Sequence, residues 1–224
     1  MKRLFTLVMA VVITISGAVS AQTQKEIRKE RRQVEKMTTK ELNSKATKSA
    51  RKEAKRLKKQ GWVVAPGALP MDKQLDRAYL MQYEYDENLY PKYIMAEAMS
   101  IGENYDGAKS QALELAKQNL AGQIQTEVTA IVENTVANKQ LSAEEAATIT
   151  ETVLASKNLI SQSLGRVIPV MECYRTKDNK NKEVLVRLAY NSEMAMEAAK
   201  NVVRKELEKK GEKLHEQLDK ALGF

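Results

Sequence analysis

The sequence predicts an α+β fold, in which a small antiparallel sheet has helices on one face. The expected order is a long basic N-terminal helix, a strand, two helices, a β-hairpin and a C-terminal helix. Apolar residues recur every three or four positions over residues 106–134, as in an amphipathic helix. Over residues 182–190, alternate positions are apolar, as in a strand with one buried face. A run rich in Lys, Glu, Arg and Ala, without Gly or Pro, covers residues 23–60 and favours a helix.

Residues 1–21 have the three parts of a secretory signal peptide: two basic residues, the apolar run 4–16, and a stretch of small residues. Val19 and Ala21 occupy the −3 and −1 positions of a cleavage site, which makes Gln22 the first mature residue. The alternative is an uncleaved anchor, but a run of about 13 residues is short for a membrane span, which needs about 20. We expect an exported protein, periplasmic or associated with the outer membrane, without a transmembrane span after cleavage.

Residues 22–60 form a basic arm with fifteen Lys and Arg against five Asp and Glu, in a chain whose net charge is +8. The charge therefore belongs to the arm, and the rest of the mature chain is net acidic. Apolar residues are sparse and follow one thin helical stripe: Ile27, Val34, Met37, Leu42, Ala46, Ala50, Ala54 and Leu57. This stripe is thinner than the seam of a long coiled coil, so we expect a polar, partly mobile helix that ends at Gly61.

Residues 61–89 are expected to be a linker and a short helix. The linker over residues 62–70 contains two prolines and a glycine, which favour bends. Leu75, Tyr79 and Tyr83 then lie four residues apart, on one face of a helix over residues 72–83.

The folded domain is expected over residues 90–224. It begins with a strand over residues 93–101, which ends at Gly102. The helix over residues 106–134 follows, with an apolar face of about eight turns.

A second helix is predicted over residues 142–164, because Ser142 and Glu145 have the spacing of a capping box. The runs 166–176 and 182–190, joined by a polar turn, predict a β-hairpin.

Pro169 interrupts the first strand of the hairpin and predicts a bulge, or a position where its missing amide is not needed. Asn191 and Ser192 are expected to cap a final helix, whose last part, residues 204–220, is highly charged.

The composition excludes several classes of site. Cys173 is the only cysteine and His215 the only histidine, so one chain cannot build a Cys/His zinc site or a Ser-His-Asp triad. Cys173 lies in a predicted strand, which favours a buried small hydrophobe. We expect no catalytic residues, no cofactor and no metal site. A carboxylate-dependent hydrolase is the least favoured alternative, because no paired acids stand out in an apolar setting.

The strand and helix over Met95–Val128 (MAEAMSIGENYDGAKSQALELAKQNLAGQIQTEV) and the hairpin over Gly165–Tyr190 (GRVIPVMECYRTKDNKNKEVLVRLAY) resemble the Lpp-twenty lipoprotein family. That family includes envelope lipoproteins and flagellar outer-membrane disk proteins. The resemblance covers about residues 90–200, and it implies an α+β domain with a structural or assembly role in the envelope and no catalytic residues. The chain departs from the family in two ways: no lipobox cysteine follows the signal, and the basic arm is extra.

Tyrosines are concentrated near the start of the domain, and Tyr83, Tyr85 and Tyr90 are the candidate ligand surface. Tyrosine rings offer flat apolar faces with a polar edge, which suits stacking against a carbohydrate. The alternative is that these rings close one end of the core.

Three functions follow as hypotheses. The first is a non-catalytic envelope protein that scaffolds or assembles a larger complex, as the resemblance implies. The second is a glycan- or peptidoglycan-binding module that uses the tyrosine-rich segment. The third is the carboxylate hydrolase. For partners, we expect an envelope protein or an acidic envelope polymer bound through residues 22–60. The sequence leaves open whether the protein forms a homo-oligomer. Export argues against nucleic acid as a partner.

Overall fold

The computed structural model describes residues 24–33, 35–36, 39–40, 43–137, 141–209 and 214–221. The expected signal peptide and its cleavage site at Ala21 and Gln22 lie outside these residues. The chain divides into two compact units, residues 1–45 and residues 46–224. The described residues between 24 and 43 are helical, whereas residues 44–47 are not. The sheet and the helices packed on it belong to the second unit.

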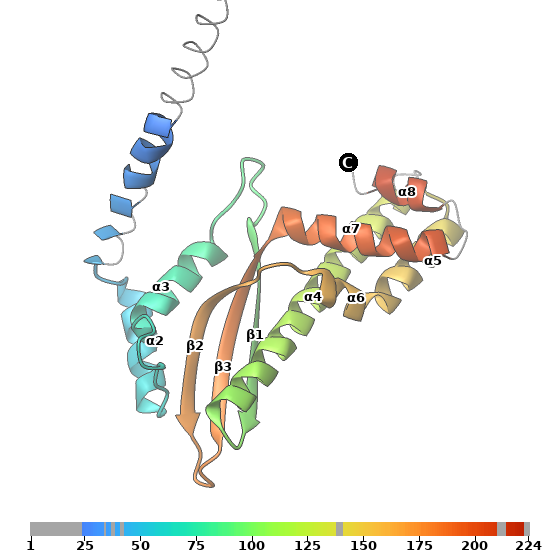
Figure 1. Cartoon of the computed structure of the whole chain (residues 1–224). Helices are drawn as coiled ribbons and strands as arrows, with labels where there is room; N and C mark the ends of the chain where they lie inside the picture. Colours follow the sequence, from blue (N-terminus) through green and yellow to red (C-terminus); the bar gives the residue numbers. More distant parts are fainter. Residues whose placement is uncertain are drawn as a thin grey trace, which may run out of the picture. The chain divides into compact units, whose positions relative to one another are not determined.

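The second unit is built on one three-stranded antiparallel sheet (Figure 1). Its strands are β1 (Tyr93–Gly102), β2 (Ile168–Thr176) and β3 (Lys182–Asn191), in the order β1-β3-β2. β1 pairs with β3 over ten residues, from Tyr93 opposite Asn191 to Gly102 opposite Lys182. β3 is therefore the central strand.

One face of the sheet is covered by α4 (Tyr105–Ala137), whose buried stripe includes Ala116, Leu120 and Ile124. A helix of 33 residues is about 50 Å long, whereas a strand of ten residues is about 33 Å long. α4 therefore extends well beyond the sheet, and its apolar stripe needs further partners there.

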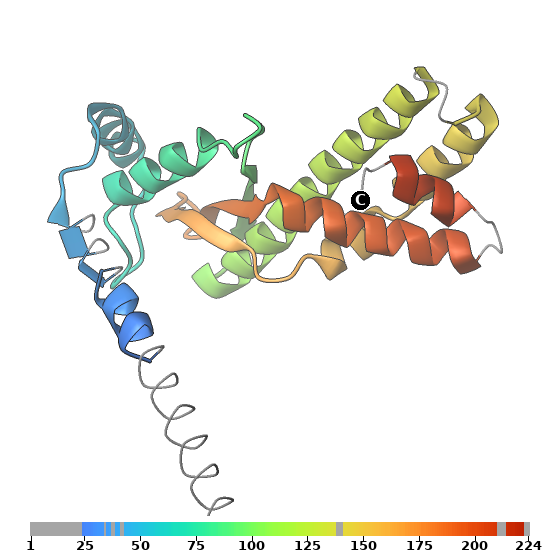
Figure 2. The same ribbon diagram turned by 90° about the horizontal axis from the view of Figure 1, so that it is seen from above.

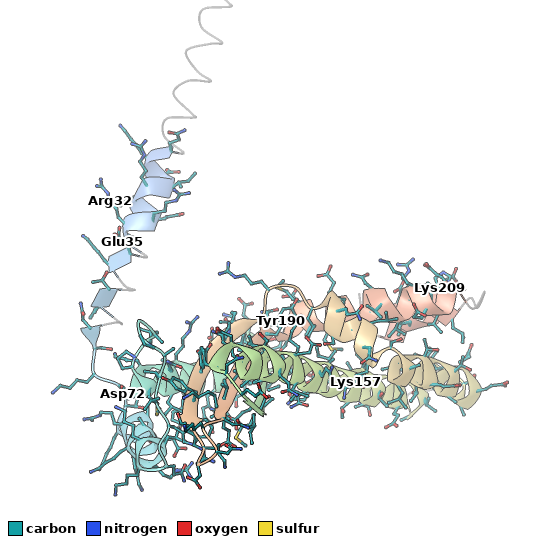
Figure 3. The ribbon with its side chains drawn as sticks, turned by 60° about the horizontal axis from the view of Figure 1, so that its bottom comes forward. Arg32, Glu35, Asp72, Lys157, Tyr190 and Lys209 are labelled. Atoms are coloured by element: carbon teal, nitrogen blue, oxygen red, sulfur yellow. The ribbon has the colours of Figure 1, made fainter. Side chains whose placement is uncertain are left out.

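These partners are four shorter helices, which pack along the projecting half of α4 (Figure 2). They are α5 (Ala143–Ala155), α6 (Lys157–Ser163), α7 (Ser192–Lys209) and α8 (Leu214–Ala221). Tyr190, at the end of β3, joins the sheet to this helical end: its hydroxyl accepts a hydrogen bond from the amide of Gly165, at 3.2 Å (Figure 3).

The opposite face of the sheet is covered by α2 (Lys48–Lys59) and α3 (Met71–Gln82) (Figure 1). Their buried residues form a cluster with Met171, Cys173 and Leu185 of the sheet. Arg175 of β2 closes this cluster, because its guanidinium lies 4.7 Å from the ring centroid of Trp62 and donates to the carbonyl of Gln60 at 3.3 Å.

Both outer edges of the sheet are capped by groups outside it. At β1, the side-chain amides of Gln123 and Asn119 of α4 donate to the carbonyls of Met95 and Glu97, at 3.0 and 2.9 Å. At β2, Val63 exchanges two backbone hydrogen bonds of 2.8 Å with Tyr174. The amide of Glu172 donates to the side chain of Gln74 at 2.7 Å.

The predicted fold class is wrong in its layout. β1 does not lie beside a separate hairpin, because it pairs with β3 in a single three-stranded sheet. Helices cover both faces of this sheet, not one. The long basic N-terminal helix is interrupted at residues 44–47, and its last part, α2, packs on the sheet. Its contact face is made mainly of alanines, whose small side chains give a weak sequence signal.

The predicted second helix is also two helices, which meet at Ser156. Gln125 of α4 is buried and donates to the carbonyls of Val153 and Leu154, at 2.7 and 2.9 Å. It thereby ties α4 to the last turn of α5.

Three local predictions are confirmed. Ser142 and Glu145 form the capping box of α5. The register of β2 shifts between Pro169 and Met171, as the proline predicts. Cys173 is buried. None of the helices in the described ranges is both long and apolar enough to cross a membrane.

Candidate functional site

Among the residues that the structure describes, an open cleft of about 940 Å³ at the start of β1 has features suited to a ligand. We call it the tyrosine cleft. Residues 82–95 form one wall, α4 forms the second, and the start of α7 forms the third. Ligand sites in proteins commonly have volumes of about 300–1,000 Å³, so this cleft has the size of such a site.

The first wall is a short hairpin over residues 84–92, which Asp86 holds in shape. The amide of Asp86 donates to the carbonyl of Tyr90 at 2.9 Å. The Asp86 carboxylate accepts hydrogen bonds from the amides of Asn88 and Tyr90, at 2.8 and 2.9 Å. Leu89, at the tip, has φ of 64°, a conformation that is unfavourable for leucine. Its side chain is 80% exposed, so burial does not explain this backbone conformation.

The base of the hairpin is closed by Lys92 and Glu84 and is tied to α7. Lys92 donates from its amide to the carbonyl of Glu84 at 2.9 Å, and the two side chains form an ion pair at 2.6 Å. Ser192, the first residue of α7, donates from its amide to the carbonyl of Lys92 and from its hydroxyl to the carbonyl of Pro91. The hairpin is therefore anchored, and its aromatic residues are held at the cleft.

The second wall is one face of α4, with Gln123, Glu127, Ala130 and Ile131 at helical spacing. The amide of Gln123 is held by its hydrogen bond to the carbonyl of Met95. Glu127 is exposed to the cleft. The surrounding protein displaces part of the hydration water of its carboxyl, and this desolvation raises the pKa of Glu127. Asn191 and Glu193 add polar groups from the third wall.

The structure brings together two of the three predicted ligand residues. Tyr85 and Tyr90 line the cleft, where their side chains are 53% and 69% exposed. Tyr83 is also exposed but lies outside the lining. Tyr93, which was not among the predicted ligand residues, also lines the cleft.

Sequence reasoning missed the polar residues opposite these rings, which are Gln123, Glu127, Asn191 and Glu193. The signal that could have found the first two is their spacing: they lie on the same face of the long helix, beside its apolar stripe. Nothing in the sequence brings residues 191 and 193 to the same place, because that depends on β1 pairing with β3.

A second cluster of titratable groups ties α4 to β2. The hydroxyl of Tyr105 donates to the carboxylate of Glu172, and the Lys109 ammonium lies 2.9 Å from the same group. The Tyr105 and Tyr174 rings meet edge to face, with centroids 5.0 Å apart. Burial and the Glu172 carboxylate raise the pKa of Tyr105, which keeps the phenol protonated as a donor. These contacts give the cluster a structural role.

Within the described ranges, no three His, Cys, Asp or Glu side chains come together as ligands for a metal ion. In comparisons with family models, with curated proteins and with solved structures, nothing matches this chain. The resemblance to the Lpp-twenty family therefore stays a prediction.

Proposed function

We propose that this protein is a non-catalytic binding protein of the cell envelope, and that the tyrosine cleft holds a segment of a glycan. The observation that carries the proposal is the composition of the cleft. Tyr85 and Tyr90 on the anchored hairpin line the same cleft as polar residues from α4 and from the start of α7. The envelope setting is supported by the signal peptide expected over residues 1–21.

The two kinds of cleft residue match the two kinds of surface on a sugar ring. The C–H faces of a pyranose can stack on a tyrosine ring, and its hydroxyls need donors and acceptors in defined places. Gln123 and Asn191 are held by their own hydrogen bonds, to Met95 and Met194 respectively. Such fixed polar groups reduce the entropy that a bound glycan must overcome.

A binding role is favoured over hydrolysis because one acid of the cleft, Asp86, already holds its own hairpin in shape. Glycoside hydrolysis uses two carboxyl groups that face the same bond. The carboxylate of Asp86 is engaged by two backbone amides of its own hairpin. Glu127 has a raised pKa, but it belongs to α4 on the opposite wall.

The test compares cleft and non-cleft tyrosines. Full-length protein is incubated with purified peptidoglycan sacculi and titrated with chitohexaose, as are the variants Tyr85→Ala/Tyr90→Ala and Tyr83→Ala. Because each stacking contact contributes about 1 kcal/mol, we expect the double variant to bind at least about tenfold more weakly. Tyr83→Ala is the matched control and should bind like the wild type.

Two results would contradict a glycan site. One is wild-type protein that binds neither sacculi nor chitohexaose. The other is binding that survives the double variant. Circular dichroism spectra of all three proteins establish that they are equally folded.

A scaffolding role is the second candidate, and exposed apolar side chains near the hairpin favour it. Leu80, Tyr83 and Leu89 are 57%, 67% and 80% exposed, and tyrosine is among the residues enriched at protein interfaces. Site-specific crosslinking from Leu89 in intact cells distinguishes the two functions. A crosslink to one envelope protein, lost in Leu80→Ser, supports a scaffold, whereas crosslinking to glycan alone supports the first proposal.

A further inference from the structure

The helix α2 carries the most concentrated charge in the folded unit. Seven of its twelve residues are basic and one, Glu53, is acidic. Glu53 pairs with Arg56. The other six bases are exposed and have no acidic partner among the residues that the structure describes: Lys48, Arg51, Lys52, Lys55, Lys58 and Lys59.

The charged face of α2 has a fixed orientation, because its other face is buried. Ala50, Ala54 and Leu57 are 0%, 2% and 7% exposed and pack in the cluster with Met171, Cys173 and Leu185. The first turn is capped by Thr47, whose hydroxyl accepts from the amide of Ala50. The amide of Thr47 donates to Asp76 of α3 at 3.0 Å. The bases are therefore displayed by a docked helix, and not by a free arm.

The spacing of the bases makes a straight row. At 100° per residue, Lys48, Lys52, Lys55 and Lys59 fall within about 60° of one another around the helix, and they span about 16 Å along its axis. Arg51, Arg56 and Lys58 flank this row on its two sides. The row lies opposite the buried alanines.

We propose that this face of α2 binds a linear acidic polysaccharide, whose carboxylate groups follow the row of lysines. Neutralising several regularly spaced anions at once releases their counterions, which is the main source of affinity in such complexes. Lysine predominates, and its ammonium is a compact point charge that does not require the planar two-point geometry preferred by arginine.

Two other anionic partners fit the face less well. A lipid surface is bound most firmly by helices that insert apolar side chains, but the apolar residues of α2 all face the sheet. Single-stranded nucleic acid is bound through aromatic rings that stack on the bases, and the sequence of α2 contains no aromatic residue.

The experiment measures binding of full-length protein to fluorescent alginate oligomers at several salt concentrations. Lys52→Gln/Lys55→Gln removes two charges from the middle of the row. The matched control, Lys157→Gln/Lys205→Gln, removes two exposed charges from α6 and α7 and changes the net charge equally. Figure 3 shows Lys157 among the helices beyond the sheet, away from α2. A third variant, Arg28→Gln/Lys29→Gln, tests the first unit.

We expect the α2 variant to bind about tenfold more weakly, with a salt dependence shallower by about one to two units in the log–log slope. The control and the Arg28→Gln/Lys29→Gln variant should stay within about twofold of the wild type. The proposal is overturned if all three variants weaken binding equally, if only Arg28→Gln/Lys29→Gln does, or if wild-type protein does not bind alginate. Stronger binding to vesicles with 30% phosphatidylglycerol, or to a 20-nucleotide DNA strand, overturns it as well.

Discussion

Glu127 lies in the tyrosine cleft, where desolvation raises the pKa of its carboxyl above the ordinary value. The folded state therefore holds this proton more tightly than the unfolded chain does. The group favours folding below its ordinary pKa, and this contribution is lost as the pH rises through the raised value. Ionised Glu127 thus lowers stability at neutral pH, as a group retained for binding can do.

We predict that Glu127→Gln has the same melting temperature as the wild type at pH 3.5 and a slightly higher one at pH 7.5. Amide and protonated carboxyl have nearly the same shape, so the difference should appear only as the wild-type carboxyl ionises. Thermal melts monitored by circular dichroism across this range measure it. Glu114→Gln, on the same helix outside the cleft, is the control. A difference in melting temperature between variant and wild type that does not change with pH would contradict the prediction.

Cys173 is enclosed between the sheet and the helices α2 and α3, and its side chain is fully buried. Burial raises the pKa of its thiol to about 12, so the nucleophilic thiolate is scarce at neutral pH. We predict no reaction with a chromogenic disulfide reagent in native protein at pH 8, and one equivalent of reaction after unfolding in guanidinium chloride. Rapid labelling of the native protein would mean that the cluster around Cys173 opens readily.

The residues of the cleft show what one sequence can reveal about a site. Tyr85 and Tyr90 were predicted because a dense set of tyrosines is visible by composition alone. Glu127 could not be chosen among many acids, because its raised pKa depends on the walls around it. Tyr83 belongs to the same sequence cluster but lies outside the lining, since it terminates α3.

At the scale of elements, α2 is the most consequential difference from the sequence prediction. Its apolar stripe is made mainly of small side chains, which is why the sequence predicts a polar arm there. In the structure, Leu57 is 7% exposed and belongs to the cluster that covers Cys173.

We predict that Leu57→Ala lowers the free energy of unfolding by about 2–4 kcal/mol, the usual cost of removing a buried leucine side chain. For a domain of this size, the melting temperature should fall by about 5–10 °C. Leu80→Ala, on the exposed face of α3, should change stability by less than about 0.5 kcal/mol. Equal effects of the two substitutions would mean that α2 does not pack on the sheet in solution.

Other elements were predictable because their signals are local. The stripe of α4, the capping box of α5 and the bulge at Pro169 each follow from a short stretch of sequence. The break at Ser156 could not be predicted, because the side chain that binds the carbonyls of Val153 and Leu154 there is Gln125, about thirty residues earlier in the chain. Local patterns identify where an element forms, but long-range contacts decide where it ends.

At the scale of the whole folded unit, the sheet is covered on both faces, and each face has its own apolar cluster. α4 and the helices α5–α8 form the larger cluster, while α2 and α3 form the smaller ones. From the sequence, all helices were expected on one face, because residues 22–60 were expected to be an arm and residues 61–89 a linker and a short helix. The order of the strands also could not be predicted from the sequence, since it depends on which strand β1 pairs with.

Shielding of both sheet edges has a consequence for aggregation. An exposed strand edge can recruit a strand from another molecule and seed fibrils, and chains that fold in a crowded compartment are especially at risk. Here two side-chain amides of α4 occupy carbonyls of β1, so that edge is protected only once α4 has docked. We predict that Asn119→Ala/Gln123→Ala shortens the lag time of aggregation at 37 °C, measured by thioflavin T fluorescence, more than Gln118→Ala does. An unchanged lag would mean that steric cover by the helix, rather than these two amides, keeps the molecules apart.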